Sequence, residues 1–123
     1  MLFRSVGATA GDRAGDKVDA GGDVDGDGND DLLVGAQYAD DGSTTNTGAV
    51  YLLYGPLSGT YALSAADATW RGANQDAYAG SALAIFGESD ADGRDDLVMG
   101  VQGTDLGSTN SVGAAYVVFG TGW

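Results

Sequence analysis

Residues 21–35 read GGDVDGDGNDDLLVG, an acidic loop followed at once by an apolar run. Five aspartates fall within residues 23–31, and the chain turns apolar at Leu32. Carboxylates packed this closely repel one another unless a cation lies among them. A short apolar run rich in branched residues predicts a buried strand. The segment therefore predicts a cation-binding loop that leads directly into a strand.

The acidic stretch belongs to an internal repeat with a period of 65 residues. Residues 7–58 align without a gap on residues 72–123, and 21 of the 52 pairs are identical. The shift matches GGDVDGDGNDDLLVGAQ with FGESDADGRDDLVMGVQ, and GAVYLLYG with GAAYVVFG. The chain is therefore two copies of one supersecondary unit.

Each copy predicts about four short strands, near residues 17–21, 32–36, 49–54 and 67–71 in the first. The central runs are apolar throughout, which is typical of strands covered on both faces. Clusters of Gly, Asp, Ser, Thr and Asn separate the strands and leave little room for helices. A four-stranded sheet repeated in tandem predicts an all-β chain of two four-stranded β-propeller blades. The spacing alone also permits a β-sandwich.

Composition excludes several classes of function. The net charge of -13 argues against nucleic acid and anionic membranes as partners and favours cations. The absence of histidine and cysteine excludes His-based triads, disulfides and most zinc sites. No apolar run approaches the length of about 18 residues that a membrane span needs.

The two acidic loops carry oxygen donors at alternate positions, the pattern that calcium ligation requires. The donors are Asp23, Asp25, Asp27 and Asp31 in the first loop and Glu88, Asp90, Asp92 and Asp96 in the second. A glycine follows each third acid, and Asn29 and Arg94 stand where a backbone carbonyl would be donated. The alternative is a solvated acidic turn, or the general acidity of a high-salt protein. Ten of the 18 acids lie in these loops at matching positions, which favours calcium.

Other acidic residues receive a structural interpretation. An EF-hand needs a bidentate acid at position twelve, where this chain has Val34 and Met99. Asp30 and Asp95 are expected to be exposed or to support a ligand from behind. Asp40 and Asp105 also align, in long surface loops, where a weak ligand role is conceivable.

These features resemble the FG-GAP repeat of integrin α-subunit β-propellers, and especially its bacterial relatives. The resemblance rests on Phe86-Gly87, the acidic loops, the runs DLLVGA and DLVMGV, and the stretch GAVYLLYGPLSGTYALSAADATW at residues 48–70. It implies Ca²⁺ between the first two strands of each blade. It assigns as ligands Asp23, Asp25, Asp27, Asn29 and Asp31 in the first blade and Glu88, Asp90, Asp92, Arg94 and Asp96 in the second.

The sequence departs from the family in three respects. The proline of the family's GAP is glutamine in both copies, at Gln37 and Gln102. The first strand reads DKVDAGG, with Asp19 where the family prefers an aromatic or small residue, so this strand is expected to fray or to pack poorly. The family's propellers usually have seven blades, whereas this chain has two.

Two blades cannot close a ring, so ring closure by homo-oligomerisation is expected. Residues 1–6 align with the fourth strand, blade one spans about residues 7–71, and blade two, at about 72–123, ends before its fourth strand. An N-terminal strand would therefore complete blade two, and three or four copies would give six or eight blades. The rival explanation is that the chain is part of a longer propeller.

The expected function is a calcium-stabilised module with a scaffold or adhesion role, in a secreted or cell-surface setting. The alternative is a carbohydrate-binding or substrate-docking accessory of a secreted enzyme, with Trp70, Trp123 and tyrosines as sugar platforms. Catalysis is not expected, because the obvious acids belong to repeated loops.

Overall fold

The computed structural model describes residues 2–120, and this part of the chain is all-β. In chain order the elements are β1 (Arg4–Val6), β2 (Lys17–Gly22), β3 (Asp31–Ala36), β4 (Ala49–Leu53), β5 (Thr60–Ala62), the short 3-10 helix η1 (Leu63–Ala65), β6 (Ala68–Arg71), β7 (Ala79–Gly87), β8 (Asp96–Val101) and β9 (Ala114–Val118). Within residues 2–120 there is no α-helix, and no helix has the length and apolarity needed to cross a membrane.

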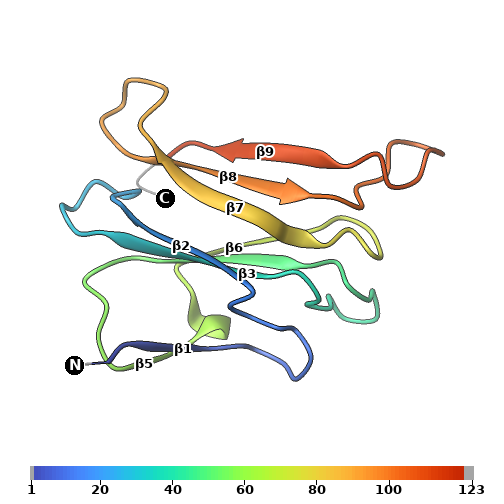
Figure 1. Cartoon of the computed structure of the whole chain (residues 1–123), viewed down its shortest axis with the longest axis horizontal. Coiled ribbons are helices and arrows are strands. Elements are labelled where there is room, and N and C mark those ends of the chain that lie inside the picture. The colour runs from blue at the N-terminus through green and yellow to red at the C-terminus, as the bar shows by residue number, and fades with distance from the viewer. Residues whose placement is uncertain (1, 121–123) are drawn as a thin grey trace.

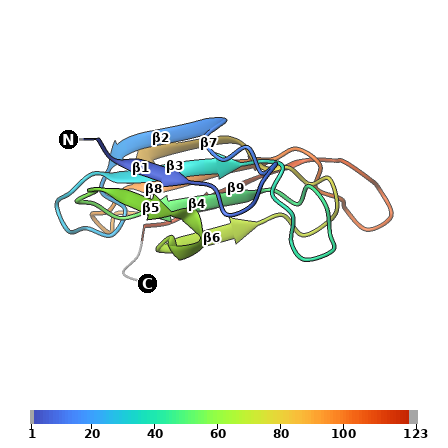
Figure 2. The ribbon, with the colours of Figure 1, turned by 90° about the horizontal axis from the view of Figure 1, so that it is seen from below.

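The strands form three stacked layers (Figure 1). The first sheet, in the middle, is antiparallel with the order β2-β3-β4-β6. The second sheet, β7-β8-β9, is antiparallel and lies on one face of the first. On the opposite face lies a layer that we call the cap: β1, β5 and η1, with β1 and β5 paired in parallel (Figure 2). Antiparallel sheets of this size are consistent with propeller blades.

The central strands of the first sheet are buried on both faces, as the sequence predicts. Every residue of β4 is buried, because alternate side chains of a strand point to opposite faces and each face has its own core. The intersheet core, between the two sheets, contains Val24, Leu33, Val50, Leu52, Leu97 and Met99. The cap core, between the first sheet and the cap, contains Val34, Ala36, Ala39, Ala49, Tyr51, Leu53 and Leu63.

The two sheets come into close backbone contact where two glycines meet. A Cβ on Gly35 of β3 would lie 2.8 Å from the carbonyl oxygen of Gly80 in β7. Gly80 itself has a φ of +84°, a conformation that favours glycine. Glycine at both positions therefore lets β7 cross the first sheet in backbone contact.

Strand β2 forms in full, and its side chains pack poorly, one of the two outcomes that the sequence predicts. Val18 is 59 % exposed. Asp19, which departs from the family pattern, accepts a 2.8 Å hydrogen bond from the backbone N–H of Ile85 in β7. The acid therefore joins the two sheets.

The second sheet has three strands within residues 2–120, and β1 does not complete it. β1 pairs instead with β5, in the layer farthest from the second sheet (Figure 1). Within one chain β1 therefore is not the fourth strand of blade two, and completion of that blade by a strand from a neighbouring chain stays a prediction. The cap holds β1 in part through Phe3, which packs against the cap core. Trp123 lies outside the described residues.

Candidate metal centres

The first acidic loop draws three carboxylates together. Oxygens of Asp23, Asp25 and Asp27 all lie within 4.8 Å of one another. Asp23 organises the turn, since its carboxylate accepts hydrogen bonds from the N–H groups of Gly26 at 2.7 Å and Gly28 at 2.8 Å. Gly28 has a φ of +89°, which confirms the sharp turn predicted at this glycine.

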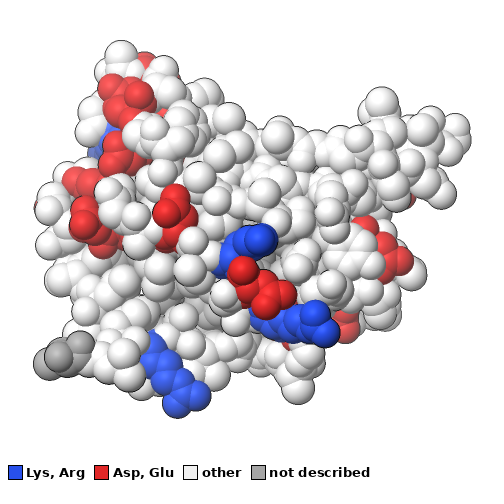
Figure 3. Space-filling model, viewed as in Figure 1, with Lys and Arg blue, Asp and Glu red and all other residues white. Residues whose placement is uncertain are grey.

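The second loop draws together a different set. Oxygens of Glu88, Asp90 and Asp96 lie within 4.8 Å of one another. Gly93 has a φ of +86°, so the chain turns at the matching position. The strand pairing also shifts at matching places before the loops, at Ala20/Gly22 and at Ile85/Gly87. Both loops lie at the same end of the molecule, and acidic side chains gather there (Figure 3).

The aspartate at position nine of each loop is buried and acts as a clamp. Asp31 is 1 % exposed and Asp96 is 0 % exposed. The two carboxylates accept hydrogen bonds of 2.7 to 2.9 Å from matched backbone amides: Val24 and Gly55 for Asp31, Ser89 and Gly120 for Asp96. Without a metal, Asp31 thus ties the first loop to the end of β4, and Asp96 ties the second loop to the residue that follows Phe119 after β9.

Several predicted ligands lie outside the two groups of three. Asp31 is one of them, although its repeat partner Asp96 is included. The side-chain Nδ2 of Asn29 donates to Asp27 at 3.0 Å. Asp92 lies 3.9 Å from the Arg94 guanidinium in an ion pair. The structure therefore gathers Asp23, Asp25, Asp27, Glu88, Asp90 and Asp96, and it leaves the carboxylates of Asp31 and Asp92 outside the two groups. Asn29 and Arg94, expected to donate backbone carbonyls, stay predictions.

The two loops are also fastened to each other, which the sequence did not reveal. The N–H of Asp23 donates to the Asp95 carboxylate at 2.8 Å, and the N–H of Asp95 donates to the Asp23 carbonyl at 2.9 Å. The Arg94 guanidinium donates to the Asp25 carbonyl at 3.1 Å. We call these three bonds the loop latch. Asp95 thus links the two sheets. The only sign of this in the sequence is that both copies have aspartate at this position, Asp30 and Asp95.

The electrostatics of the loops favour a cation. Burial raises the pKa of Asp25, and the charges of Asp27 and Asp23 raise it further. Burial likewise raises the pKa of Asp31, against the lowering effect of its amide donors. Burial, and then the charge of Asp92, raises the pKa of Asp90. These carboxylates hold their charge at a cost that a divalent cation would remove.

Asp96 behaves differently from its repeat partner. Burial opposes its ionisation, but the hydrogen bonds from Ser89 and from the N–H of Gly120 outweigh that effect and hold its pKa below the ordinary value. The Ser89 hydroxyl has no equivalent in the first copy, where Val24 stands. The hydrogen bonds of the second clamp therefore favour its ionised form, whereas burial disfavours the ionised form of Asp31.

The donor set fits a hard cation. Only oxygen ligands are offered, which suits Ca²⁺ or Mg²⁺ and not Zn²⁺. The carboxylates are exposed or half-buried apart from Asp96, so the ion would keep access to water as further ligands. Asp40 and Asp105 lie outside both groups; their carboxylates brace the surface loops by accepting the N–H groups of Asn46 and Ser111.

The fold and the loops define a tandem β-sheet repeat with acidic, metal-competent turns. The family model of the FG-GAP repeat matches residues 14–53, the segment that holds β2, the first acidic loop, β3 and β4. Residues 14–53 are therefore an FG-GAP repeat. Such repeats are usually non-catalytic modules. The search of curated proteins found no match.

Proposed function

We propose that this chain is a calcium-binding β-propeller module with a structural role. The observation that carries the proposal is the convergence of three carboxylates in each of two repeated loops, two of them at matching positions: Asp23 with Glu88 and Asp25 with Asp90. A repeated site supports architecture, since an active site would need to occur only once. The FG-GAP match over the first loop supports the same function.

Calcium would stabilise the module by joining residues that otherwise repel. Bound between β2 and β3, or between β7 and β8, it would neutralise the clustered charge and hold the loop in its turn. A ligand that binds only the folded state adds about 2.7 kcal/mol of stability at a free concentration of 100 times its Kd. Binding energy would thus become folding energy.

The role we infer is a scaffold or an adhesion surface in an extracellular or cell-surface setting. Extracellular calcium modules bind at about 10⁻⁴ to 10⁻³ M, concentrations of calcium found outside cells. The net charge of -13 fits a partner with a positive or neutral surface. The carbohydrate-binding alternative has less support, because Trp70 packs against the intersheet core.

The test compares two acids of the first loop that differ in geometry. Asp25→Asn removes one charge from the group of three, and Asp30→Asn removes one charge from an exposed acid of the same loop outside that group. We expect calcium to raise the Tm of the parent chain, and the rise to be reduced in Asp25→Asn and kept in Asp30→Asn. Isothermal titration with Ca²⁺ gives the number of sites independently. A parent Tm that ignores calcium would overturn the proposal, as would an equal loss in both variants.

A further inference from the structure

The interface between the two sheets joins two unlike surfaces. The first sheet contributes Leu33, Val50 and Leu52, and the second contributes Leu97 and Met99, to the intersheet core. Because the sheets are copies of one unit, each has a surface of both kinds. In the interface each sheet uses one of its two surfaces. The second sheet therefore keeps a free surface of the kind that the first sheet uses, and the first sheet keeps one of the kind that the second uses.

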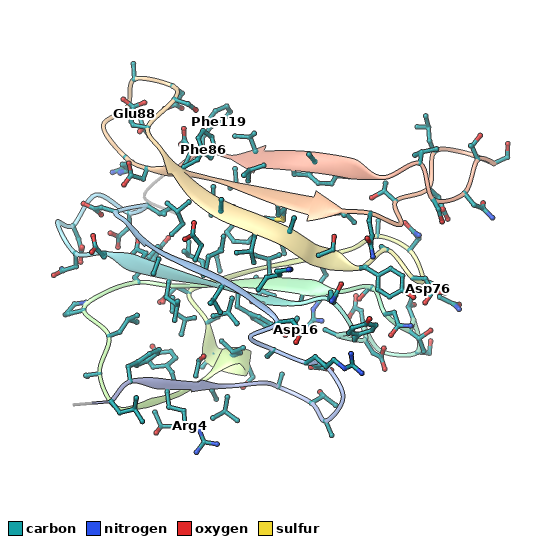
Figure 4. All side chains as sticks on the ribbon, in the orientation of Figure 1. Arg4, Asp16, Asp76, Phe86, Glu88 and Phe119 are labelled. Carbon is teal, nitrogen blue, oxygen red and sulfur yellow. The ribbon has the colours of Figure 1, made fainter. Side chains whose placement is uncertain are left out.

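The uncovered surface of the second sheet is apolar. Val117 is 49 % exposed, whereas its repeat partner Leu52 is 0 % exposed within the intersheet core. Phe119 and Phe86 are each 47 % exposed, and both project from this sheet near the Glu88 loop (Figure 4). Isolated exposed apolar residues are ordinary, but a group on one sheet marks a contact surface.

The uncovered surface of the first sheet is smaller, because the cap covers its centre. Val18 of β2 remains 59 % exposed beside the cap. Its repeat partner Leu83 packs against the intersheet core. Val18 is therefore placed to pack into a second interface between sheets, as Leu83 packs into the first.

Strand β9 also has an open edge. Its repeat partner β4 pairs with β3 on one side and β6 on the other, whereas β9 pairs with β8 alone within residues 2–120. Beside β9 lies a pocket of about 290 Å³ whose lining includes Trp70, Met99 and Tyr116. Tyr116 is 49 % exposed there, while its partner Tyr51 is 1 % exposed. An extended segment can pair with such an edge through its backbone.

The chain itself contains a strand with the matching pattern. With the repeat period of 65 residues, β6 (Ala68–Arg71) aligns with residues 3–6, which include β1. In β6, Ala68 and Trp70 are half-buried while Thr69 and Arg71 are exposed; Phe3 and Ser5 are half-buried while Arg4 and Val6 are exposed. Within residues 2–120, β1 is paired along one edge only, with β5.

We propose that the open edge and face of the second sheet bind the β1 side of a second copy of this chain. The β4–β6 pairing fixes the register, which is antiparallel: Ala114 with Val6, Ala115 with Ser5, Tyr116 with Arg4 and Val117 with Phe3. The inference rests on the blade architecture of the proposed function, and it does not need calcium. Head-to-tail contacts of this kind form a ring when the rotation between copies closes, and three or four copies would then give six or eight blades.

The loop latch supplies a second, independent element of the contact. Asp95 joins the loops within the chain by accepting the N–H of Asp23. Asp30, its repeat partner, is exposed, and its carboxylate has no hydrogen bond or ion pair to any residue that the structure describes. In the second interface Asp30 takes the place of Asp95, and it accepts the N–H of Glu88 of the second copy.

Cysteine pairs test the register directly, because the chain has no cysteine of its own. Ser5→Cys with Ala115→Cys places thiols on directly opposite residues, whose Cα atoms lie about 4.5 to 5.5 Å apart, within disulfide reach. The control, Ser5→Cys with Tyr116→Cys, is one residue out of register, so its side chains leave opposite faces. Within one chain β1 and β9 lie in the outermost layers, so a disulfide must join two copies (Figure 1).

We expect covalent oligomers from the in-register pair under mild oxidation, and mostly monomer from the control, on a non-reducing gel. Light scattering of the parent chain should give a trimer or tetramer, and Asp30→Ala should shift it towards monomer. Free thiols in the in-register pair, equal cross-linking in the control, or dimers from Ala115→Cys alone would each overturn the proposal. If the double variants do not fold, a monomeric parent chain would overturn it.

The calcium-dependent rise in Tm, measured on the same samples, separates this proposal from the function. If the chain is a monomer whose Tm rises with calcium, the proposed interface is wrong and the proposed calcium module is supported. If register-specific oligomers form and the Tm does not change with calcium, the proposed calcium sites are wrong and the proposed interface is supported.

Discussion

Single aspartates do different work in the two loops, although their positions match. Asp25 lies in the carboxylate group, with its pKa raised by burial and by Asp27 and Asp23. Asp31 is a buried acceptor for two backbone amides. A charge that repels its neighbours and a charge that satisfies amides have opposite effects on the metal-free fold.

That difference predicts how two substitutions behave. Asp31→Ala should lower stability with and without calcium by about 1–3 kcal/mol, because it leaves two buried N–H groups unpaired. Asp25→Ala should lower the Tm in calcium and change it little in chelator. Thermal unfolding in both conditions measures the pattern. If Asp31→Ala is destabilised only in calcium, Asp31 acts mainly as a metal ligand and its hydrogen bonds to the backbone contribute little.

Tyr51 is the second test at this level. Its hydroxyl is buried in the cap core and has no hydrogen-bond partner among residues 2–120; burying an unpaired hydroxyl normally costs about 1–3 kcal/mol. Tyr51→Phe should therefore leave stability unchanged or raise it by up to about 1 kcal/mol in urea unfolding. Tyr116→Phe, on the exposed repeat partner, is the control and should have no effect. A loss of stability in Tyr51→Phe would mean that the hydroxyl is paired.

At the level of elements, the cap replaces a neighbouring sheet. It covers β3 and β4 with Phe3, Leu57 and Leu63, and Leu63 in η1 is fully buried. The same face of β9 meets the first sheet instead, where Val118 packs against the intersheet core but Tyr116 stays 49 % exposed. Two copies of nearly the same strand are thus buried or exposed according to whether a covering segment packs on them.

The cap predicts a sharp contrast between two leucines. Leu63→Ala should destabilise the chain by about 2–5 kcal/mol, because it opens a cavity in the cap core. Leu106→Ala, at a position that is 72 % exposed, should change stability by less than about 0.5 kcal/mol. Urea midpoints of the two variants make the comparison. Similar midpoints would mean that the cap contributes little to the fold.

For the whole molecule, the clustered acids couple stability to pH. Burial and neighbouring charges hold the pKa values of Asp25, Asp31 and Asp90 above the ordinary 3.8. Between 3.8 and those raised values the folded chain binds more protons than the unfolded chain, so stability falls as pH rises through that window. Asp96, with a lowered pKa, acts oppositely and loses its contribution only as pH falls through its folded value.

This linkage predicts two outcomes. In chelator, the contribution of the three raised acids should stabilise the fold as pH falls from neutral towards their pKa values. In calcium, the rise in Tm should be smaller at about pH 5 than at about pH 7, because protons compete for the ligands. Melting curves across pH with and without calcium check both. A calcium effect that is independent of pH would exclude carboxylates with raised pKa values as ligands.

Local chemistry was enough for the repeat, the strands and the acidic turns. Continuous apolar runs near residues 32–36 and 49–54 indicated burial on both faces, and β3 and β4 confirm it. The glycines at positions 28 and 93 indicated turns, and both have positive φ. These features depend on neighbours in the chain, and so they are visible in the sequence.

Contacts between distant segments needed the tertiary structure. The sequence indicated an N-terminal strand but not its partner within the chain, β5, with which β1 pairs beside the apolar cap core that Phe3 joins. It treated Asp95 as a supporting acid and Arg94 as a ligand position, and both fasten one loop to the other. Matching positions in the two copies carry similar residues but meet different surroundings. Which partner each position meets is decided by the packing of the layers, and a periodic sequence does not encode that difference.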